Sequence, residues 1–206
     1  NVVFYNTTTK ELTYGTVQDL RADAISNGSF IWAVDNTTGA LFSDAGVYIA
    51  DNSNSVVIGQ NVDVTNTNPN RVAIGYNAGQ YSQSVDTVAI GGNAANTSQN
   101  FFATAVGYNA GQNTQGNSSV AVGHAAGKEY QSSDAVAVGT AAGLNNQGYG
   151  AVAVGQRAGA GYDGNQGYNA VAIGSYAAQD AQGDYAVAIG YEAGDYSGSG
   201  SIAIGD

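Results

Sequence analysis

The hydrophobic pattern of the chain is dominated by an apolar four-residue unit, Val-Ala-Ile-Gly, which occurs at residues 72–75 and returns with small changes up to the C-terminal end. The glycines that close the unit are separated by six steps of 16 residues and then by steps of 19, 16 and 15. They are Gly59, Gly75, Gly91, Gly107, Gly123, Gly139, Gly155, Gly174, Gly190 and Gly205. Such regularity predicts one supersecondary unit that is stacked many times.

The unit alternates large and small residues, so as a strand it places positions 1 and 3 on one face and positions 2 and 4 on the other. A repeat of 16 residues with glycine at two or three places allows two short strands and two tight turns, and it leaves no room for a helix. Stacked coils would pair each strand with its copies in two parallel sheets. The sequence therefore predicts an all-β chain, in which residues 55–206 form a parallel β-roll, or solenoid, of about ten 16-residue coils.

Two further positions recur once per repeat, counted from the first residue of the unit. Position 7 is alanine at Ala78, Ala94, Ala110, Ala126, Ala142, Ala158, Ala177 and Ala193. A glutamine column follows at Gln83, Gln99, Gln115, Gln131, Gln147, Gln166 and Gln182. Stacked amides can donate to and accept from their own copies. We expect the glutamines to form such a ladder or to satisfy turn backbone groups, and the Val and Ile side chains to pack inside against the position-7 alanines.

The 19-residue step marks a local insertion near residues 162–165. The glutamine column regains its 16-residue spacing after Gln166. We therefore expect the inserted residues to loop out of the roll without breaking the ladder on either side.

Residues 1–54 carry no complete unit and are expected to form an N-terminal cap of β-hairpins. Two pairs of apolar runs flank polar turns, residues 2–5 with 11–14 and residues 30–34 with 40–42. This pattern is typical of hairpins, and residues 46–50 predict a further strand. The single Trp and three of the five Phe lie in this region, which favours a cap that closes the first coil.

Position 2 of the unit is expected to present a flat, nearly uncharged alanine stripe to the outside. Such a stripe is a packing surface, so we expect several chains to meet along it, around an axis parallel to the stack. The seam residues of this hypothesis are Ala73, Ala89, Ala105, Ala121, Ala137, Ala153, Ala172, Ala188 and Ala203.

Composition excludes several classes of protein. The chain contains 30 Gly, but a fixed apolar unit at constant spacing is not typical of low-complexity disorder. Five basic and 16 acidic residues give a net charge of −11, which argues against nucleic acid as a partner. The absence of Cys excludes disulfides and thiolate chemistry.

No apolar run is long enough to cross a bilayer, so we expect no direct membrane insertion by this segment. The chain contains no Met and begins at Asn1. We therefore expect it to be part of a longer protein, in which targeting or anchoring segments lie elsewhere.

The sequence offers little support for catalysis. His124 is the single histidine and lies in a predicted surface turn, so no catalytic triad can be built. The acidic residues Asp86, Asp134, Asp180, Asp184, Glu192 and Asp195 do not recur as a matched pair and are interpreted as solvated surface charge. The inserted Asp163-Gly164-Asn165 is similar to a calcium turn but occurs once. We expect no catalytic residue, no metal and no other cofactor.

Tyrosines are the better candidates for binding. Tyr76, Tyr108 and Tyr191 share position 5, and Tyr81 and Tyr196 share position 10. They are expected to form discontinuous surface columns whose amphipathic rings suit contacts with sugar or protein. The alternative interpretation is that they cover glycine-rich turns.

The repeated unit resembles the head repeats of trimeric autotransporter adhesins, called YadA-like heads. The resemblance covers residues 55–206 and is clearest at residues 72–75, 171–174 and 187–190. Similar repeats occur in bacteriophage tail fibres, and residues 4–14 are similar to segments of phage fibre proteins. The resemblance implies a left-handed β-roll that forms a homotrimer, is extracellular on a bacterial surface or a virion tail fibre, and attaches to a host surface glycan or protein.

Two function classes follow from these observations. The first is a non-enzymatic attachment fibre or adhesin head that binds by avidity. The second is a structural filament or spacer without a ligand. An enzyme built on the scattered carboxylates is less favoured. An ice-binding solenoid is least favoured, because it needs threonine ladders in register, which the chain lacks.

Overall fold

The computed structural model describes residues 54–205 in full, together with the backbone of five N-terminal strands. These are β1 (Val2–Tyr5), β2 (Leu12–Gly15), β3 (Ala33–Val34), β4 (Leu41–Ser43) and β5 (Val47–Ala50). Ten strands carry the repeated unit: β6 (Ser55–Ile58), β7 (Val72–Ile74), β8 (Val88–Ile90), β9 (Thr104–Val106), β11 (Val120–Val122), β13 (Val136–Val138), β14 (Val152–Val154), β15 (Val171–Ile173), β16 (Val187–Ile189) and β17 (Ile202–Ile204). The described residues contain no helix.

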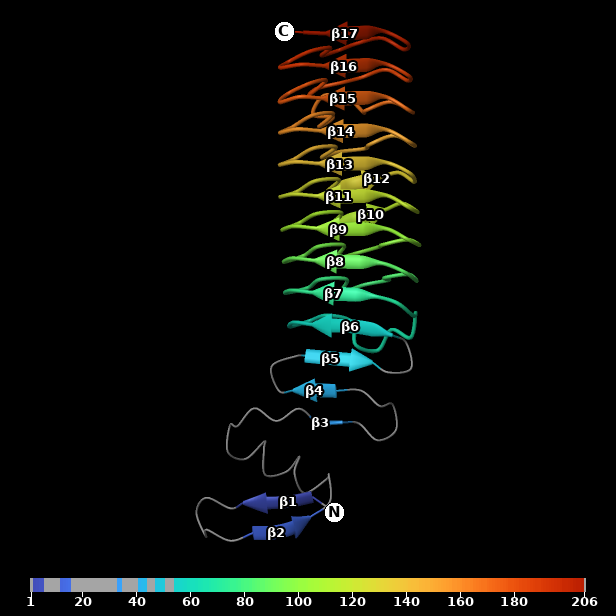
Figure 1. Cartoon of the computed structure of the whole chain (residues 1–206). Coiled ribbons are helices and arrows are strands. Elements are labelled where there is room, and N and C mark those ends of the chain that lie inside the picture. Colours follow the sequence, from blue (N-terminus) through green and yellow to red (C-terminus); the bar gives the residue numbers. More distant parts are fainter. Residues whose placement is uncertain are drawn as a thin grey trace.

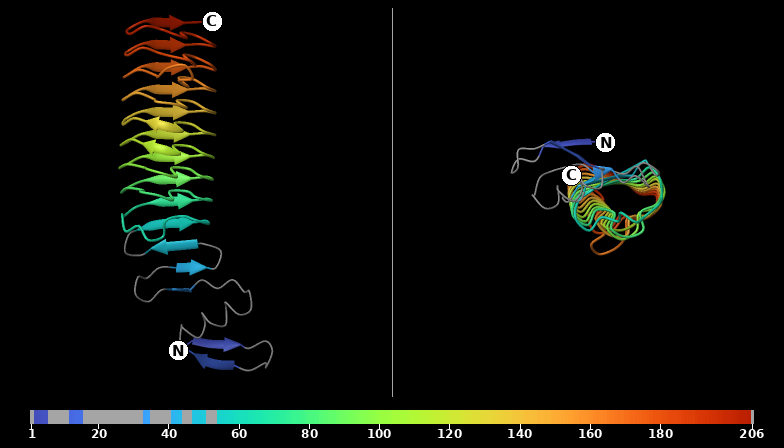
Figure 2. Two further views of the ribbon diagram at one scale, coloured as in Figure 1. Left: turned by 180° about the vertical axis from the view of Figure 1, so that it is seen from behind. Right: turned by 90° about the horizontal axis from the view of Figure 1, so that it is seen from below.

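The ten repeat strands stack in parallel, each on its copy in the next coil (Figure 1). The register pairs equivalent positions of successive repeats, so that Ala121 pairs with Ala105 on one side and with Ala137 on the other. Seen along the stack, the coils superimpose as a closed outline (Figure 2). The prediction of a parallel β-solenoid with 16-residue coils is confirmed.

The opposite side of each coil is less regular. Strands β10 (Asn113–Gln115) and β12 (Glu129–Gln131) pair in parallel there. In other coils the glutamine column forms isolated parallel bridges instead, as between Gln83 and Gln99 and between Gln166 and Gln182. The glutamines therefore mark the second line of pairing in the roll.

The predicted N-terminal strands are confirmed as backbone elements. Strands β1 and β2 pair antiparallel, as do β3 with β4 and β4 with β5. Strand β5 then pairs antiparallel with β6, so that β3, β4 and β5 extend the same sheet beyond the first coil. The polar connections 6–10 and 35–39 and the Trp32 side chain lie outside the described residues.

The interior of the roll corrects the expected orientation of the unit. The position-2 alanines point inward, and Ala137 has 0% of its surface exposed, whereas Val136 and Val138 lie outside. The core consists chiefly of position-2 and position-7 alanines. The expectation that Val and Ile fill the interior is therefore wrong, because a coil this narrow must also hold the glutamine side chains.

Five of the seven glutamines cross the interior beside a glycine that leaves room for them, and Gln99 and Gln182 have Ala95 and Ala178 at this position instead. A Cβ added at Gly127 would lie 2.8 Å from Gln131 Oε1. Gln131 Nε2 donates to the carbonyl oxygen of Val120 at 2.9 Å and to Gln147 Oε1 at 3.0 Å. The predicted amide ladder is confirmed from Gln83 to Gln147 and from Gln166 to Gln182.

A buried arginine ends the ladder near the N-terminal cap. Arg71 is 2% exposed, and its guanidinium donates to the carbonyl oxygens of Asn66 at 2.7 Å and Asn68 at 3.0 Å and to Gln83 Oε1 at 3.3 Å. The planar guanidinium, with five donors, serves several acceptors at once. It takes the place of the glutamine that the first coil lacks.

Candidate functional site

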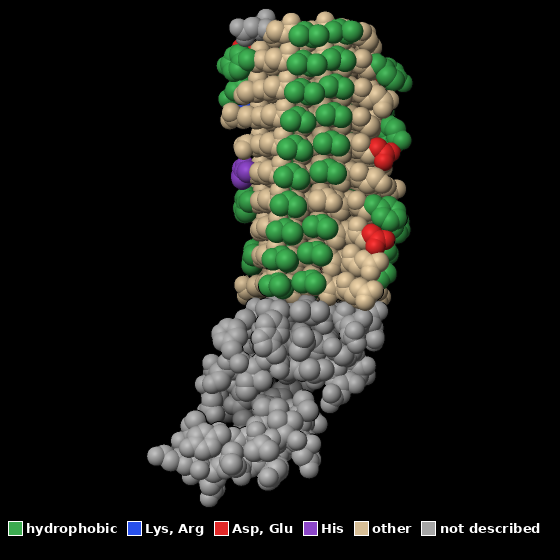
Figure 3. Space-filling view, in the orientation of Figure 1, with side chains coloured by type: hydrophobic (Ala, Val, Ile, Leu, Met, Phe, Trp, Pro, Cys, Tyr) green, Lys and Arg blue, Asp and Glu red, His purple; other side chains and the backbone are tan. Residues whose placement is uncertain are grey.

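The outward side of the repeat strands forms one long apolar face (Figure 3). We call the side chains at positions 1 and 3 of the unit the apolar face. Position 1 contributes Val56, Val72, Val88, Thr104, Val120, Val136, Val152, Val171, Val187 and Ile202, and position 3 contributes Ile58, Ile74, Ile90, Val106, Val122, Val138, Val154, Ile173, Ile189 and Ile204. Val138, Ile173 and Ile189 retain 36%, 39% and 37% of their surface in the single chain. Apart from Ile202 and Ile204 in the last strand, these are the most exposed residues of the face, so neighbours in the same chain already cover about three fifths or more of each side chain.

The alanine seam predicted from the sequence is wrong. Eight of its nine residues, Ala73, Ala89, Ala105, Ala121, Ala137, Ala153, Ala172 and Ala188, are fully buried inside one chain. Ala203 is partly exposed because it belongs to the last strand. Side chains that face the interior of a roll cannot meet another chain. The surface available for assembly on this sheet is therefore the apolar face.

The position-5 tyrosines lie at one margin of the apolar face, in the turn that follows each strand. Tyr76, Tyr108 and Tyr191 keep 54%, 54% and 53% of their surface, so the prediction that they are exposed is confirmed. The ring of Tyr108 stacks on His124 of the next coil, with 5.7 Å between centroids and 14° between planes. His124 is thus an exposed turn residue, as expected.

Tyr81 and Tyr196 are exposed as predicted, at 57% and 63%, but they do not share a structural position. Tyr81 lies two residues before Gln83, whereas Tyr196 directly precedes Ser197, which pairs with Gln182. Tyr196 is therefore the counterpart of Ser82, and both have a left-handed backbone, with φ of 54° and 55°. The 15-residue step in the last complete coil caused the difference.

The insertion leaves the backbone pairing intact but interrupts the side-chain ladder. Gln147 still bridges Gln166, and Gly148 N–H donates to the carbonyl oxygen of Gln166 at 2.9 Å. Gln166 Oε1, however, is buried without a hydrogen-bond partner. The prediction of an unbroken ladder is therefore confirmed for the backbone and wrong for the amides at this one step.

The inserted loop is held against later coils. Tyr196 Oη donates to an Asp163 carboxylate oxygen at 2.6 Å. This hydrogen bond, with smaller contributions from burial and the nearby carboxylates, raises the pKa of Tyr196 to about 12. The Arg157 guanidinium lies 5.8 Å from the ring centroid of Tyr162 and 5.7 Å from that of Tyr176. The contacts are on the surface, where such interactions contribute little to stability.

Deletion of residues 163–165 is expected to leave the free energy of unfolding within about 1 kcal/mol of the wild type, or to raise it. The variant loses the exposed Tyr196–Asp163 contact, while a 16-residue step allows Gln147 to donate to Gln166. Thermal unfolding followed by circular dichroism measures the effect. Deletion of residues 129–131 from a regular coil is the control and should unfold the roll. A similar loss in both deletions would show that the inserted loop is part of the core.

The candidate catalytic and metal-binding side chains do not gather at one site among the described residues. Within residues 54–205 there is no group of three or more His, Asp or Glu side chains arranged to hold a metal ion. Asp86, Asp134, Glu192 and Asp195 are exposed, with Glu192 and Asp195 in the same turn, and Asp180 and Asp184 are half-exposed. No helix suited to crossing a lipid bilayer occurs among the described residues.

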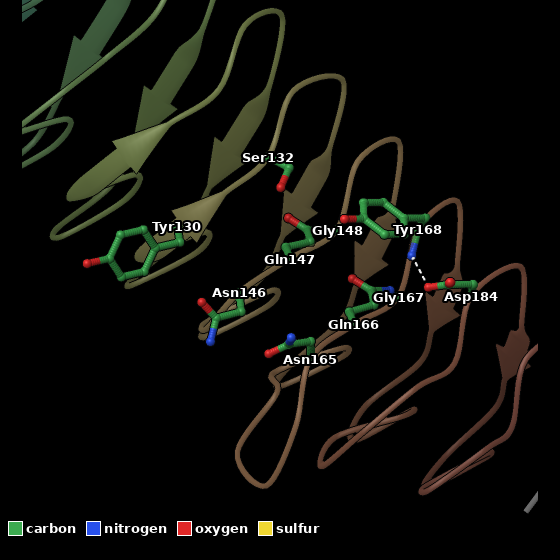
Figure 4. A pocket seen from close by; sticks show the side chains of 10 residues that line it. All are labelled: Tyr130, Ser132, Asn146, Gln147, Gly148, Asn165, Gln166, Gly167, Tyr168 and Asp184. Carbon is green, nitrogen blue, oxygen red and sulfur yellow. Dashed lines mark hydrogen bonds between the residues drawn. The ribbon is translucent and has the colours of Figure 1, made fainter.

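A surface groove of about 250 Å³ lies beside the insertion, on the glutamine side of the roll (Figure 4). Tyr130 and Tyr168 border it, and Asn146 and Asn165 from consecutive coils lie between them. Sequence reasoning missed this site because its side chains do not recur in a column. The available signal was the insertion itself, whose last residue, Asn165, lines the groove.

Comparison of the chain with protein-family models, curated proteins and solved structures gave no match.

Proposed function

We propose that this chain is part of a non-enzymatic extracellular attachment fibre or adhesin head, on a bacterial surface or a virion tail fibre. In this proposal three copies associate through the apolar face, and their outer turns bind a host surface glycan or protein. The observation that carries the proposal is the apolar face itself. It runs the whole length of the roll in two columns, and Thr104 interrupts one of them.

The size of the face supports an assembly. Ten strands at about 4.8 Å and three residues of about 3.3 Å give an area of roughly 48 by 10 Å. This is close to 480 Å², in the range of the largest apolar patch on a typical monomer, which is often functional. The neighbouring turns would add area on both sides. A continuous seam of this shape fits a partner with the same repeat, which is a second copy of the chain.

The number three follows from the resemblance to YadA-like head repeats. An outward surface repeated three times would suit attachment by many weak contacts, because linked sites raise the effective concentration of the second and third contact. The exposed tyrosines are the candidates for these contacts. Amphipathic rings bind both sugars and proteins at exposed positions.

The second candidate is a spacer that carries other domains and has no ligand. It is favoured by the amide ladder, which continues through most of the stack and suits a stiff rod. Both candidates need the trimer, and only the attachment fibre needs a binding surface. Attachment to cells therefore separates them.

The double variant Val106→Glu and Val138→Glu is expected to be a folded monomer. Both side chains point out of the roll, so a single chain can solvate the charges, whereas a dry seam cannot. Light scattering after size-exclusion chromatography should give one third of the wild-type mass, with an unchanged circular dichroism spectrum. Attachment to host cells should fall at least tenfold through lost avidity.

The matched control is Ser82→Glu with Thr114→Glu, two exposed positions on the glutamine side that are also two coils apart. This variant should remain trimeric. A monomeric wild type, or a trimer that survives the charges in the apolar face, would contradict the proposed assembly. A wild-type trimer that attaches to no host cell would favour the spacer.

A further inference from the structure

We propose that the groove beside the insertion binds an uncharged oligosaccharide. The inference rests on the proposed attachment function and names the class of ligand.

The floor of the groove is backbone because the stacking leaves no room for side chains there. A Cβ added at Gly148 would lie 2.6 Å from the carbonyl oxygen of Gly167. Each of these glycines follows a glutamine that points inward. Because these side chains are missing, a shallow trough runs between the residues that precede the glutamines and the residues that follow the glycines. An open trough of this kind suits a chain-like ligand that lies along the stack.

Tyr130 occupies a backbone position that costs stability. Its φ is 52°, and the equivalent residues of the neighbouring coils are Thr114, with φ of 50°, and Asn146, with φ of 42°. A bulky residue in the left-handed region costs on the order of 1 kcal/mol or more, whereas Asn tolerates this region well. The ring is also 61% exposed, so it adds little packing in return. Phe102 and Tyr185 carry the same cost outside the groove, so Tyr130 is distinguished by its place beside the groove rather than by its backbone.

The second ring and the amides complete the lining. Tyr168 is 57% exposed, and its backbone N–H donates to an Asp184 carboxylate oxygen at 2.9 Å, as Figure 4 shows. The exposed side-chain amides of Asn146 and Asn165 have no hydrogen-bond partner among the described residues. Each amide offers two donors and one acceptor. Two rings beside free amides match a ligand with flat apolar faces and peripheral hydroxyls, which describes a pyranose sugar.

The charge of the groove selects against acidic ligands. No Lys, Arg or His lines it, and Asp184 contributes a carboxylate. The chain as a whole carries a net charge of −11. A sialylated, sulfated or phosphorylated glycan would therefore be repelled.

The geometry also disfavours an extended peptide. Peptides often bind by adding a strand to a free sheet edge. Here Gly148 and Gly167 already donate to the carbonyl oxygens of Gln166 and Gln182 in the next coil, so the backbone of the groove offers no free edge.

Asn146 and Asn165 lie one coil apart, at about 4.8 Å. This spacing suits a polymer whose hydroxyls recur at a similar interval.

The test is direct binding of glycans to the wild-type protein, first on an array and then in solution. The probes are a printed array of uncharged oligosaccharides of glucose, galactose, mannose and N-acetylglucosamine, with sialylated and sulfated glycans beside them. We expect uncharged members to bind, and calorimetry with the best of them should show at least tenfold weaker binding to Tyr130→Asn and to Tyr168→Ser. Tyr130→Asn should unfold at the same temperature as the wild type or higher, because Asn suits the left-handed backbone.

Phe102→Asn is the matched control, since Phe102 is also an exposed aromatic residue with a left-handed backbone, 61% exposed with φ of 62°, and does not line the groove. This variant should bind the glycan as the wild type does. Binding of acidic glycans alone, no binding of any uncharged glycan, or unchanged binding by both tyrosine variants would each overturn the proposal. If the wild type attaches to cells while Tyr130→Asn attaches equally well, the groove proposal fails and the attachment function stands. If the wild type binds glycans but does not attach to cells, the groove proposal stands and the attachment function fails.

Discussion

A single glutamate in place of Ala137 is expected to unfold the middle of the roll. Ala137 is 0% exposed and is packed between Ala121 and Ala153 of the adjacent coils. A carboxylate at this site would be buried among alanines without a cation, and an unpaired buried charge costs at least about 4 kcal/mol. Since small domains are stable by only about 5–15 kcal/mol, most of the stability of the stack would be lost.

The neighbouring residue provides the sharpest comparison. Val138→Glu adds the same carboxylate one residue later, where the side chain points outward, and the chain should stay folded. Circular dichroism during heating and urea titration should show a cooperative transition for Val138→Glu and little or no transition for Ala137→Glu. If Ala137→Glu instead gave a stable folded monomer, the alanine stripe would be an outer seam after all.

Replacement of Gln131 by Ala is expected to lower the free energy of unfolding by about 3–5 kcal/mol. The side chain is 1% exposed. Its Nε2 donates to the carbonyl oxygen of Val120 and to Gln147 Oε1, and its Oε1 accepts from Gln115 Nε2 at 3.3 Å. Truncation leaves Gln147 Oε1 without a donor and removes one of the acceptors of Gln115 Nε2, which keeps the carbonyl oxygen of Thr104. It also opens a cavity beside Gly127.

Two further variants separate the causes. Gln131→Met restores most of the volume without the amide, so a loss that persists in this variant is due to hydrogen bonding. Gln156→Ala removes an exposed glutamine and should change stability by no more than about 0.5 kcal/mol. Urea titration of the three variants at one protein concentration gives the comparison. A Gln131→Ala variant as stable as Gln156→Ala would show that the ladder does not support the roll.

The orientation of the unit could not be predicted from its pattern. Alternation along a strand separates two faces, and Val and Ile are the residues most often buried. That preference led to the wrong face, because the interior of this roll is set by the size of the coil. Ala73 and Ala78 already fill the width that Gln83 leaves. The large side chains are therefore placed outside, where they suit contact with another copy.

The repeat spacing alone determined the fold class, the parallel register and the exposure of Tyr76, Tyr108 and Tyr191, and it predicted the amide ladder as one of two roles for the glutamines, because each depends on what recurs from coil to coil. Features that occur once depended on the tertiary structure. Arg71 ends the ladder, Gln166 lacks its partner, and Tyr130 borders a groove with Tyr168. These arise where coils of different composition or length meet, and only the closed and stacked chain determines which side chains then lie together.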